Sequence, residues 1–327
     1  MHIPDNYLSP ATCAVMGAVM VPVWAVAVRK VRTEVSNARV PLLGIGAAFS
    51  FLLMMFNVPL PGGTTGHAVG GTLLAVLLGP WSACISISIA LLVQALMFGD
   101  GGILAFGANC FNMAFVIPFL GYVLFSVIRD VSKGRRAEYA GLAAGSYISI
   151  SVAALCAAIE LGVQPLLFRG PSGLPLYFPW PISVSIPAMV LPHLAVAGVA
   201  EAIFTVAIFT FIKRVSPGTI SAAPKPRFRG VYALLVALVC LSPLGLLASG
   251  TAWGEWGIGE IGKMVGYVPE GMRRGFSFRA LFPDYAVTGM SGVIGYVISA
   301  ITGAAVLVIT FKLIGLARRE NRRKALT

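Results

Sequence analysis

Long apolar runs separated by short polar segments dominate the chain. A helix that crosses a bilayer needs about 20 mainly apolar residues, because the hydrocarbon core is roughly 30 Å thick and a helix rises about 1.5 Å per residue. The pattern therefore predicts an all-α fold, a polytopic transmembrane helical bundle. The expected spans are residues 10–28, 40–60, 81–98, 108–128, 139–163, 186–212, 231–250 and 286–314.

A further apolar piece, 68–79, is too short to span comfortably alone and ends at Gly79-Pro80, a helix stop. Basic residues mark cytoplasmic loops, and an odd number of crossings is needed between loop 61–67 and the basic cluster near residue 130. We therefore expect the short piece to cross, shielded from lipid by neighbouring helices. This gives about nine spans, an amino terminus outside and a cytoplasmic carboxyl terminus. The basic clusters are Arg29/Lys30/Arg32/Arg39, Arg129/Lys133/Arg135/Arg136, Lys213/Arg214/Lys225/Arg227/Arg229 and the carboxyl tail.

The polar, proline-containing stretch 215–230 divides the chain. We expect a seven-span membrane core at 1–214, a cytoplasmic linker at 215–230 and a two-span accessory region at 231–327. The alternative is one domain with a long cytoplasmic loop. Loop 251–285 is placed outside by the alternation of spans, although it carries four basic residues that are offset by four acidic ones.

Composition supports a membrane protein and argues against other classes. Only 11% of residues are charged, 57% are hydrophobic and the mean hydropathy is +0.87, so the lipid bilayer is the expected environment. The net charge of +12 does not indicate nucleic acid, because the basic residues sit in short clusters between apolar runs. The five cysteines form no C-x-x-C pair and are expected to pack inertly. The first residues lack a positive n-region, so no signal peptide is expected and the native amino terminus should persist.

The second residue, His2, suggests a metal site at the amino terminus. A free α-amine followed by histidine closes two chelate rings on one metal through the Met1 amine, the ionised His2 amide and a His2 imidazole nitrogen. One more nitrogen completes a square-planar set, the geometry that suits Ni(II) or Cu(II). His67, in the glycine-rich loop 61–67 on the same side, is positioned to supply it. The competing interpretation is a frayed terminus without a role.

Other polar residues within apolar runs are candidates with simpler alternatives. His193 is a possible third histidine ligand or relay, or else a packing histidine bonded to a neighbouring carbonyl. Glu160 and Glu201 are intramembrane carboxylates, for which a structural partner and a functional role are both open. The remaining candidates, which would orient the ligands or simply cap helices, are Asp5, Asp100 and Asn109.

Several motifs of catalysis do not occur in the sequence. No G-x-x-x-x-G-K-[ST] is present, so this chain is not expected to bind ATP in the P-loop manner. Neither G-x-S-x-G nor H-E-x-x-H occurs, and an intramembrane enzyme is poorly supported.

The motifs also carry a family resemblance. Residues 1–10 (M-H-I-P-D-N-Y-L-S-P) and 66–73 (G-H-A-V-G-G-T-L), with the motifs at 78–81, 94–102 and 107–113, closely resemble the CbiM/NikM family. These are the substrate-binding membrane components of energy-coupling-factor cobalt and nickel importers, and the resemblance covers roughly residues 1–215. The region from about 230 onward, with motifs at 266–272 and 282–285, is similar to the small two-span N-type accessory component.

The resemblance implies a transport component rather than an enzyme. It implies that Ni(II) or Co(II) is the transported substrate and is held by Met1, His2 and His67. It also implies partners in trans, a transmembrane coupling (T) protein and ABC-type ATPase subunits, in the inner cell membrane. Asn6 stands where glycine is expected in many relatives, outside the ligand set.

Two other functional classes follow from the same pattern of spans. A vitamin-type carrier for a small organic substrate would not need the set of Met1, His2 and His67. A membrane enzyme would need a nucleophile with a nearby base or an open metal position, and a sensor would need a cytoplasmic effector domain, for which every cytoplasmic loop is too short. Nickel is favoured over cobalt, because an ionised amide in a planar nitrogen set suits nickel.

Overall fold

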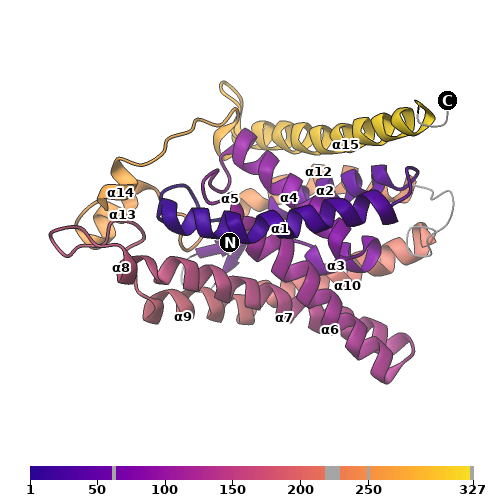
Figure 1. Ribbon diagram of the computed structural model, residues 1–327, viewed down its shortest axis with the longest axis horizontal. Coiled ribbons are helices and arrows are strands. Elements are labelled where there is room, and N and C mark those ends of the chain that lie inside the picture. The colour runs from indigo at the N-terminus through magenta and orange to yellow at the C-terminus, as the bar shows by residue number, and fades with distance from the viewer. Residues whose placement is uncertain (61–63, 218–228, 249–250, 325–327) are drawn as a thin grey trace.

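The computed structural model describes residues 1–60, 64–217, 229–248 and 251–324. Figure 1 shows helices that run side by side along the long axis of the molecule, with the amino terminus in the middle of the bundle. The architecture confirms the predicted helical membrane bundle. Among the described residues, seven helical segments are long and apolar enough to cross a membrane: Pro10–Glu34, Pro80–Phe98, Phe106–Ser132, Arg135–Leu167, Ile182–Val215, Arg229–Leu247 and Gly292–Arg318.

Several of these segments are made of more than one helical piece. The first half of the chain holds α1 (Pro10–Glu34), α4 (Pro80–Val93) with the π-helical turn η1 (Gln94–Phe98), α5 (Phe106–Asn109) with the π-helical turn η2 (Cys110–Val116), and α6 (Ile117–Ser132). The second half holds α7 (Arg135–Gly162), α8 (Gln164–Leu167), α9 (Ile182–Pro192) with the π-helical turn η3 (His193–Ala197), α10 (Gly198–Val215), α12 (Arg229–Leu241) with the 3-10 turn η4 (Ser242–Leu247), and α15 (Gly292–Lys324).

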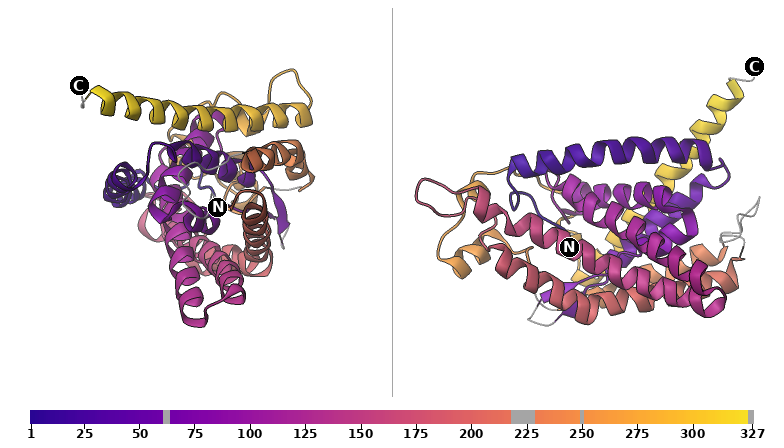
Figure 2. Two further views of the ribbon diagram at one scale, coloured as in Figure 1. Left: turned by 90° about the vertical axis from the view of Figure 1, so that its right-hand side faces the viewer. Right: turned by 60° about the horizontal axis from the view of Figure 1, so that its bottom comes forward.

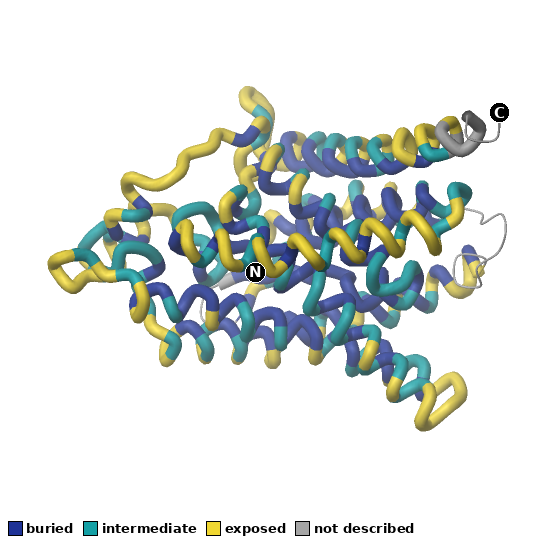
Figure 3. The backbone as a smooth tube through the Cα atoms, viewed as in Figure 1, coloured by how far each residue is buried: buried dark blue, intermediate teal, exposed yellow. Residues whose placement is uncertain are grey.

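Helix α1 begins where the sequence requires it. Ser9 has extended backbone angles, and its hydroxyl accepts a hydrogen bond from the backbone N–H of Thr12 at 3.0 Å. Pro10 follows in the first helical position, where its missing N–H costs nothing. The outward residues of α1 are apolar and exposed, among them Val15 and Val21, as lipid contact requires. Figure 3 shows such exposed positions on α1 and α15.

Helix α2 (Val40–Met54) forms the centre of the bundle. All its residues except Pro41 are buried, and it packs against α4, α12 and α15. A Cβ built on Gly44 would lie 2.7 Å from Phe311 Cβ, so this glycine lets α15 approach closely. The region after the linker therefore rests directly on the centre of the core.

Two predicted spans are shorter than expected. The prediction 40–60 ends at Met54, and the chain then forms an antiparallel hairpin of β1 (Val58–Leu60) and β2 (Thr64–Gly66), paired Val58 with Gly66. The piece 68–79 contains only α3 (Gly71–Leu78), about 12 Å long. Most of α3 is buried among other helices, as irregular or short segments at membrane depth require.

The predicted helix stop after α3 is confirmed. Gly79 has φ +85°, which glycine adopts without strain, and Pro80 starts α4 immediately afterwards.

The described basic clusters gather at one end of the bundle. Arg318 of α15 donates to the carbonyl of Arg32 at the end of α1 at 2.9 Å, and Lys213 of α10 pairs with Glu138 of α7 at 2.5 Å. The loop 251–285 lies at the opposite end, with α13 (Ile258–Val265) and α14 (Glu270–Arg273) (Figure 1). The short η5 (Pro283–Tyr285) follows. This separation agrees with the predicted alternation of spans; Lys225 and Arg227 lie outside the described residues.

Candidate metal centre

The first nine residues run inward rather than along the surface. His2, Ile3, Tyr7 and Leu8 are buried, and the amino terminus lies inside the bundle in both views of Figure 2. The backbone N–H of Ile3 donates to Asn109 Oδ1 at 2.7 Å, and the Ile3 carbonyl accepts from Asn109 Nδ2 at 3.1 Å. Asn109 thus pairs with both polar groups of the residue that follows His2, which fixes the depth of the segment.

A glycine makes room for this segment. Asp5 accepts hydrogen bonds from the backbone N–H groups of Ile103 at 3.0 Å and Leu104 at 2.7 Å. The Gly102 N–H donates to the Ile3 carbonyl at 2.8 Å. A Cβ on Gly102 would lie 2.5 Å from the Asp5 nitrogen, a distance that real Cβ atoms do not show. Asp5 therefore anchors the segment to the backbone of the facing loop.

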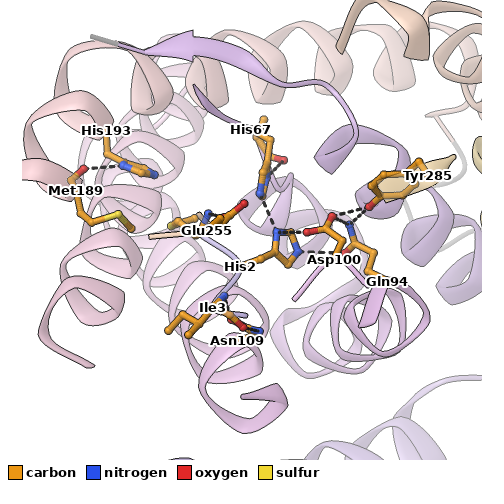
Figure 4. Close-up of polar contacts among 12 residues, drawn as sticks. His2, Ile3, His67, Gln94, Asp100, Asn109, Met189, His193, Glu255 and Tyr285 are labelled. Atoms are coloured by element: carbon orange, nitrogen blue, oxygen red, sulfur yellow. Dashed lines mark hydrogen bonds and ion pairs between the residues drawn. The ribbon is translucent and has the colours of Figure 1, made fainter. Parts of the chain in front are cut away.

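The structure brings His2 and His67 together. His2 Nδ1 lies 3.1 Å from His67 Nε2, and the ring centroids are 4.9 Å apart with the planes tilted by 40°. Figure 4 shows the two rings facing each other across the site. Metal–nitrogen bonds of about 2.0–2.1 Å at a right angle place two nitrogens about 2.9 Å apart. The observed spacing is therefore close to that of two adjacent ligands of one metal.

The outer nitrogens of both rings have acceptors within reach. His2 Nε2 lies 3.4 Å from Gln94 Oε1, and His67 Nδ1 lies 3.2 Å from the carbonyl of Ala68. Protons on these outer nitrogens would leave His2 Nδ1 and His67 Nε2 free to bind a metal, the arrangement that outer hydrogen bonds commonly impose on metal-binding histidines.

Asp100 forms a third side of the site. Its Oδ1 lies 3.3 Å from His2 Nδ1, so it pairs with His2 whenever that nitrogen is protonated. Its Oδ2 accepts from the Tyr285 hydroxyl at 2.5 Å and from Gln94 Nε2 at 3.1 Å. Burial raises the pKa of Tyr285 well above its usual value, and Asp100 raises it further, so the phenol stays a donor.

The α-amine of Met1 is also buried at the site. It forms an ion pair with Glu255 Oε1 at 3.2 Å, and the side chain of Met1 is 1% exposed. Burial lowers the pKa of His67 well below its usual value, and the positive amino terminus and His2 lower it further. His67 is therefore a neutral imidazole at neutral pH, the form that binds metal.

A cavity of about 450 Å³ opens beside these groups. Its lining includes His2, His67, Asp100, Glu255 and Asp284, so both histidines and three carboxylates face the same space. Among the described residues, no three His, Cys, Asp or Glu side chains form a group able to hold a metal ion. The predicted set does not need one, because two of its four nitrogens come from the backbone.

The hydrogen bonds of His193, Glu160 and Glu201 do not involve the rings of His2 or His67. His193 Nδ1 donates to the Met189 carbonyl at 2.7 Å, as the packing interpretation predicts (Figure 4). Glu160 accepts a hydrogen bond from Asn112, and Glu201 accepts two from the backbone just after His67. Three π-helical turns, η1, η2 and η3, begin at or next to Gln94, Asn109 and His193, and such turns are frequent at functional sites.

Sequence reasoning missed the contribution of the carboxyl-terminal region and of Gln94. Glu255 and Tyr285 follow the linker by many residues, and nothing in their local spacing points to the amino terminus. Gln94 belongs to the motif at 94–102, but the sequence analysis gives it no role. Its position as an uncharged polar residue within an apolar run could have marked it as a candidate.

Comparison with known proteins supports these observations. Residues 2–219 match CbiM, described as the cobalt uptake substrate-specific transmembrane region, and residues 229–320 match the PDGLE domain. The probable fused nickel transport protein LarMN of Lactiplantibacillus plantarum is 51% identical over 321 residues, which are 95% of this chain and 97% of that protein. The fused nickel transport protein NikMN of Rhodobacter capsulatus is 46% identical over 348 residues, with 99% of each chain covered.

A solved structure is also similar. A truncated transition metal transporter superposes with a TM-score of 0.62 and 55% identity, covering 65% of this chain and 98% of that chain. The CbiM match over residues 2–219 includes both His2 and His67. The chain belongs to the CbiM family, with a PDGLE domain following in the same polypeptide.

Proposed function

We propose that this multi-pass membrane protein is the substrate-binding component of an importer for a divalent transition metal, with Ni(II) favoured over Co(II). The observation that carries the proposal is the 3.1 Å approach of His2 Nδ1 to His67 Nε2. The family supports metal transport, and two close relatives over the full chain are named as nickel transport proteins. The chain is a transport component and not an enzyme.

The proposed ligands are four nitrogens. The Met1 amine, the His2 amide and His2 Nδ1 close two chelate rings, and His67 Nε2 completes the set. A planar set of nitrogens that includes an ionised amide suits Ni(II) better than Co(II). The burial of the Met1 amine beside Glu255 supports its place in the site.

The cargo enters through the cavity on the side of loop 251–285. There Asp100, Glu255 and Asp284 attract a hydrated cation. Binding expels a proton from the ammonium group and the proton of the His2 amide, and Glu255, which paired with the ammonium group, is released.

The remaining parts of the transporter act in trans. We infer a transmembrane coupling protein and ABC-type ATPase subunits, which pull the site apart by ATP-driven movement. We place the chain in the inner cell membrane with the basic end of the bundle in the cytoplasm, because positive residues favour that side. The amino terminus then faces the extracytoplasmic cavity.

The test is calorimetry of nickel and cobalt binding to the chain with its native amino terminus. A matched variant carries His2→Gln, which removes the imidazole and keeps the amine of Met1 in front of a bulky residue. We expect tight nickel binding by the native chain and its loss in the variant. Equal binding by both proteins, or binding by neither, would rule out the terminal site.

A further inference from the structure

Glu201 of α10 is a fully buried carboxylate that the binding site does not use. Its side chain has no exposed surface, and each oxygen accepts a backbone hydrogen bond of 2.8 Å. The donors are the N–H groups of Val69 and Gly70, two and three residues after His67. Glu201 therefore holds the backbone that carries the histidine ligand.

The position of these donors explains why a carboxylate is present. The segment after His67 leads into α3, and Gly70 stands at its N-cap with φ +72° and no side chain to accept hydrogen bonds. The first N–H groups of a helix lack partners within it and favour a negative charge. Glu201 supplies that charge from a different helix.

A second hydrogen bond from another helix holds a carbonyl group of the same segment. The hydroxyl of Ser50 in α2 donates to the Val69 carbonyl at 2.7 Å, and Ser50 is completely buried. Both polar groups of Val69 are therefore bound by helices from outside the segment. Since His67 contributes only one nitrogen, its distance from His2 depends on where this backbone is held.

Glu160, the other buried carboxylate among the described residues, behaves differently. Glu160 of α7 accepts from Asn112 Nδ2 at 2.8 Å, while Glu160 Oε1 and Asn112 Oδ1 have no partner among the described residues. This pair joins two side chains and touches neither His2 nor His67. Glu160 is thus a matched control in burial and charge.

We propose that Glu201 is a positioning residue that fixes His67 Nε2 at ligand distance from His2 Nδ1 through the backbone of Val69 and Gly70. The inference rests on the proposed function, because it gives His67 the role of the fourth ligand. Glu201 does not bind the metal. Its loss leaves three chelating nitrogens in place and displaces the fourth.

The test is nickel binding by Glu201→Gln, followed by calorimetry and by the visible absorption spectrum of bound nickel. Glutamine offers one acceptor oxygen, so either Val69 or Gly70 loses its partner and faces an NH₂ group. Residues behind the metal ligands typically change affinity by about 10–100-fold, and we expect a loss of that size. The spectrum of Glu201→Gln should shift towards that of His67→Ala.

The control is Glu160→Gln, whose amide can accept from Asn112 Nδ2 and donate to Asn112 Oδ1. It should bind nickel as the native chain does, with an unchanged spectrum. Wild-type affinity and spectrum in Glu201→Gln would overturn the inference, as would weaker binding with the native spectrum. If Glu201→Gln fails to fold, Ser50→Ala replaces it: a several-fold loss with the same spectral shift supports the inference, and no change contradicts it.

The two proposals fail in distinguishable ways. If the native chain binds no nickel, or if His2→Gln binds nickel as tightly as the native chain, the proposed function is wrong. If the native chain binds and His2→Gln does not, while Glu201→Gln matches Glu160→Gln, only the role of Glu201 is wrong.

Discussion

The two walls of the proposed metal cavity contact different parts of the amino-terminal segment. In the core, Asn109 pairs with both polar groups of Ile3, and Asp5 accepts from two backbone N–H groups. In the carboxyl-terminal region, Glu255 pairs with the Met1 amine and Tyr285 bonds to Asp100. The core thus sets the geometry of the ligand atoms, and the carboxyl-terminal wall supplies charge and closes the cavity. Changes in the core should therefore weaken binding much more than changes in the wall.

The largest effect is expected from His67→Ala. Removing one of four nitrogens should weaken nickel binding by about a hundredfold or more, beyond the range of supporting residues. His193→Ala is the matched control, since its Nδ1 bonds to the Met189 carbonyl and it should leave affinity unchanged. Calorimetry measures both. A large loss of nickel affinity in His193→Ala, with little loss in His67→Ala, would mean that His193 and not His67 is the fourth ligand.

Acid should weaken binding steeply. Protons compete with the metal for the amine and the amide, so affinity falls as pH falls, by about a hundredfold per unit while both protons are released. The lowered pKa of His67 keeps this ring neutral, so it adds nothing to the slope near neutral pH. Titrations in buffers of different ionisation enthalpy count the protons. A pH-independent affinity would contradict an ionised amide ligand.

Gly102→Ala tests the geometry that the core imposes. Its Cβ would meet Asp5 at 2.5 Å and push the amino-terminal segment away from the site. We expect about a 10–100-fold loss of nickel affinity, because the ligands are displaced but not removed. Gly17→Ala, where a Cβ meets nothing within 4 Å, is the control. Equal affinities in the two variants would show that this close approach does not matter.

The smallest effect is expected on the carboxyl-terminal wall. Glu255→Gln removes the ion pair with the Met1 amine. Because a partly exposed ion pair contributes little free energy, nickel affinity should change by no more than about fivefold. Nickel association should slow at low ionic strength, because the cavity loses a negative charge. Glu270→Gln on the exposed α14 is the control. If Glu255→Gln lost as much nickel affinity as His67→Ala, this wall would contain a metal ligand. The expected difference between the two walls would then be wrong.

Much of the fold follows from the sequence because apolar runs and basic clusters are local signals. The seven long helices begin and end near the predicted positions, and Gly79-Pro80 ends α3 as expected. The predicted span 40–60 is too long. The apolar residues Val58 and Leu60 fit a continuing helix in the sequence, but in the structure they belong to a strand of the hairpin.

Only part of the candidate site could be predicted from the sequence. His2 and His67 stood out because histidines are scarce, and the structure places them in contact. Asp5 was expected to orient a ligand, yet it bonds to the backbone of the facing loop. The contacts made by Glu255 and Tyr285 join segments far apart in the chain, and periodicity carries no information about such pairs.

Asn6 stands where the resemblance leads us to expect glycine, and its backbone conformation fits that expectation. Its φ of +69° is a conformation that favours glycine. Its side chain both donates to and accepts from the backbone of Phe276 at 2.8 Å, so these bonds offset the strain and tie the segment to the carboxyl-terminal region.

The most direct test of the ligand set is X-ray absorption spectroscopy of the nickel-loaded native chain. The account predicts a four-coordinate, planar metal surrounded by nitrogen, with the scattering signature of two imidazole rings. Six-coordinate nickel with oxygen ligands would contradict it, and would move the site from the amino terminus and His67 to the carboxylates of the cavity.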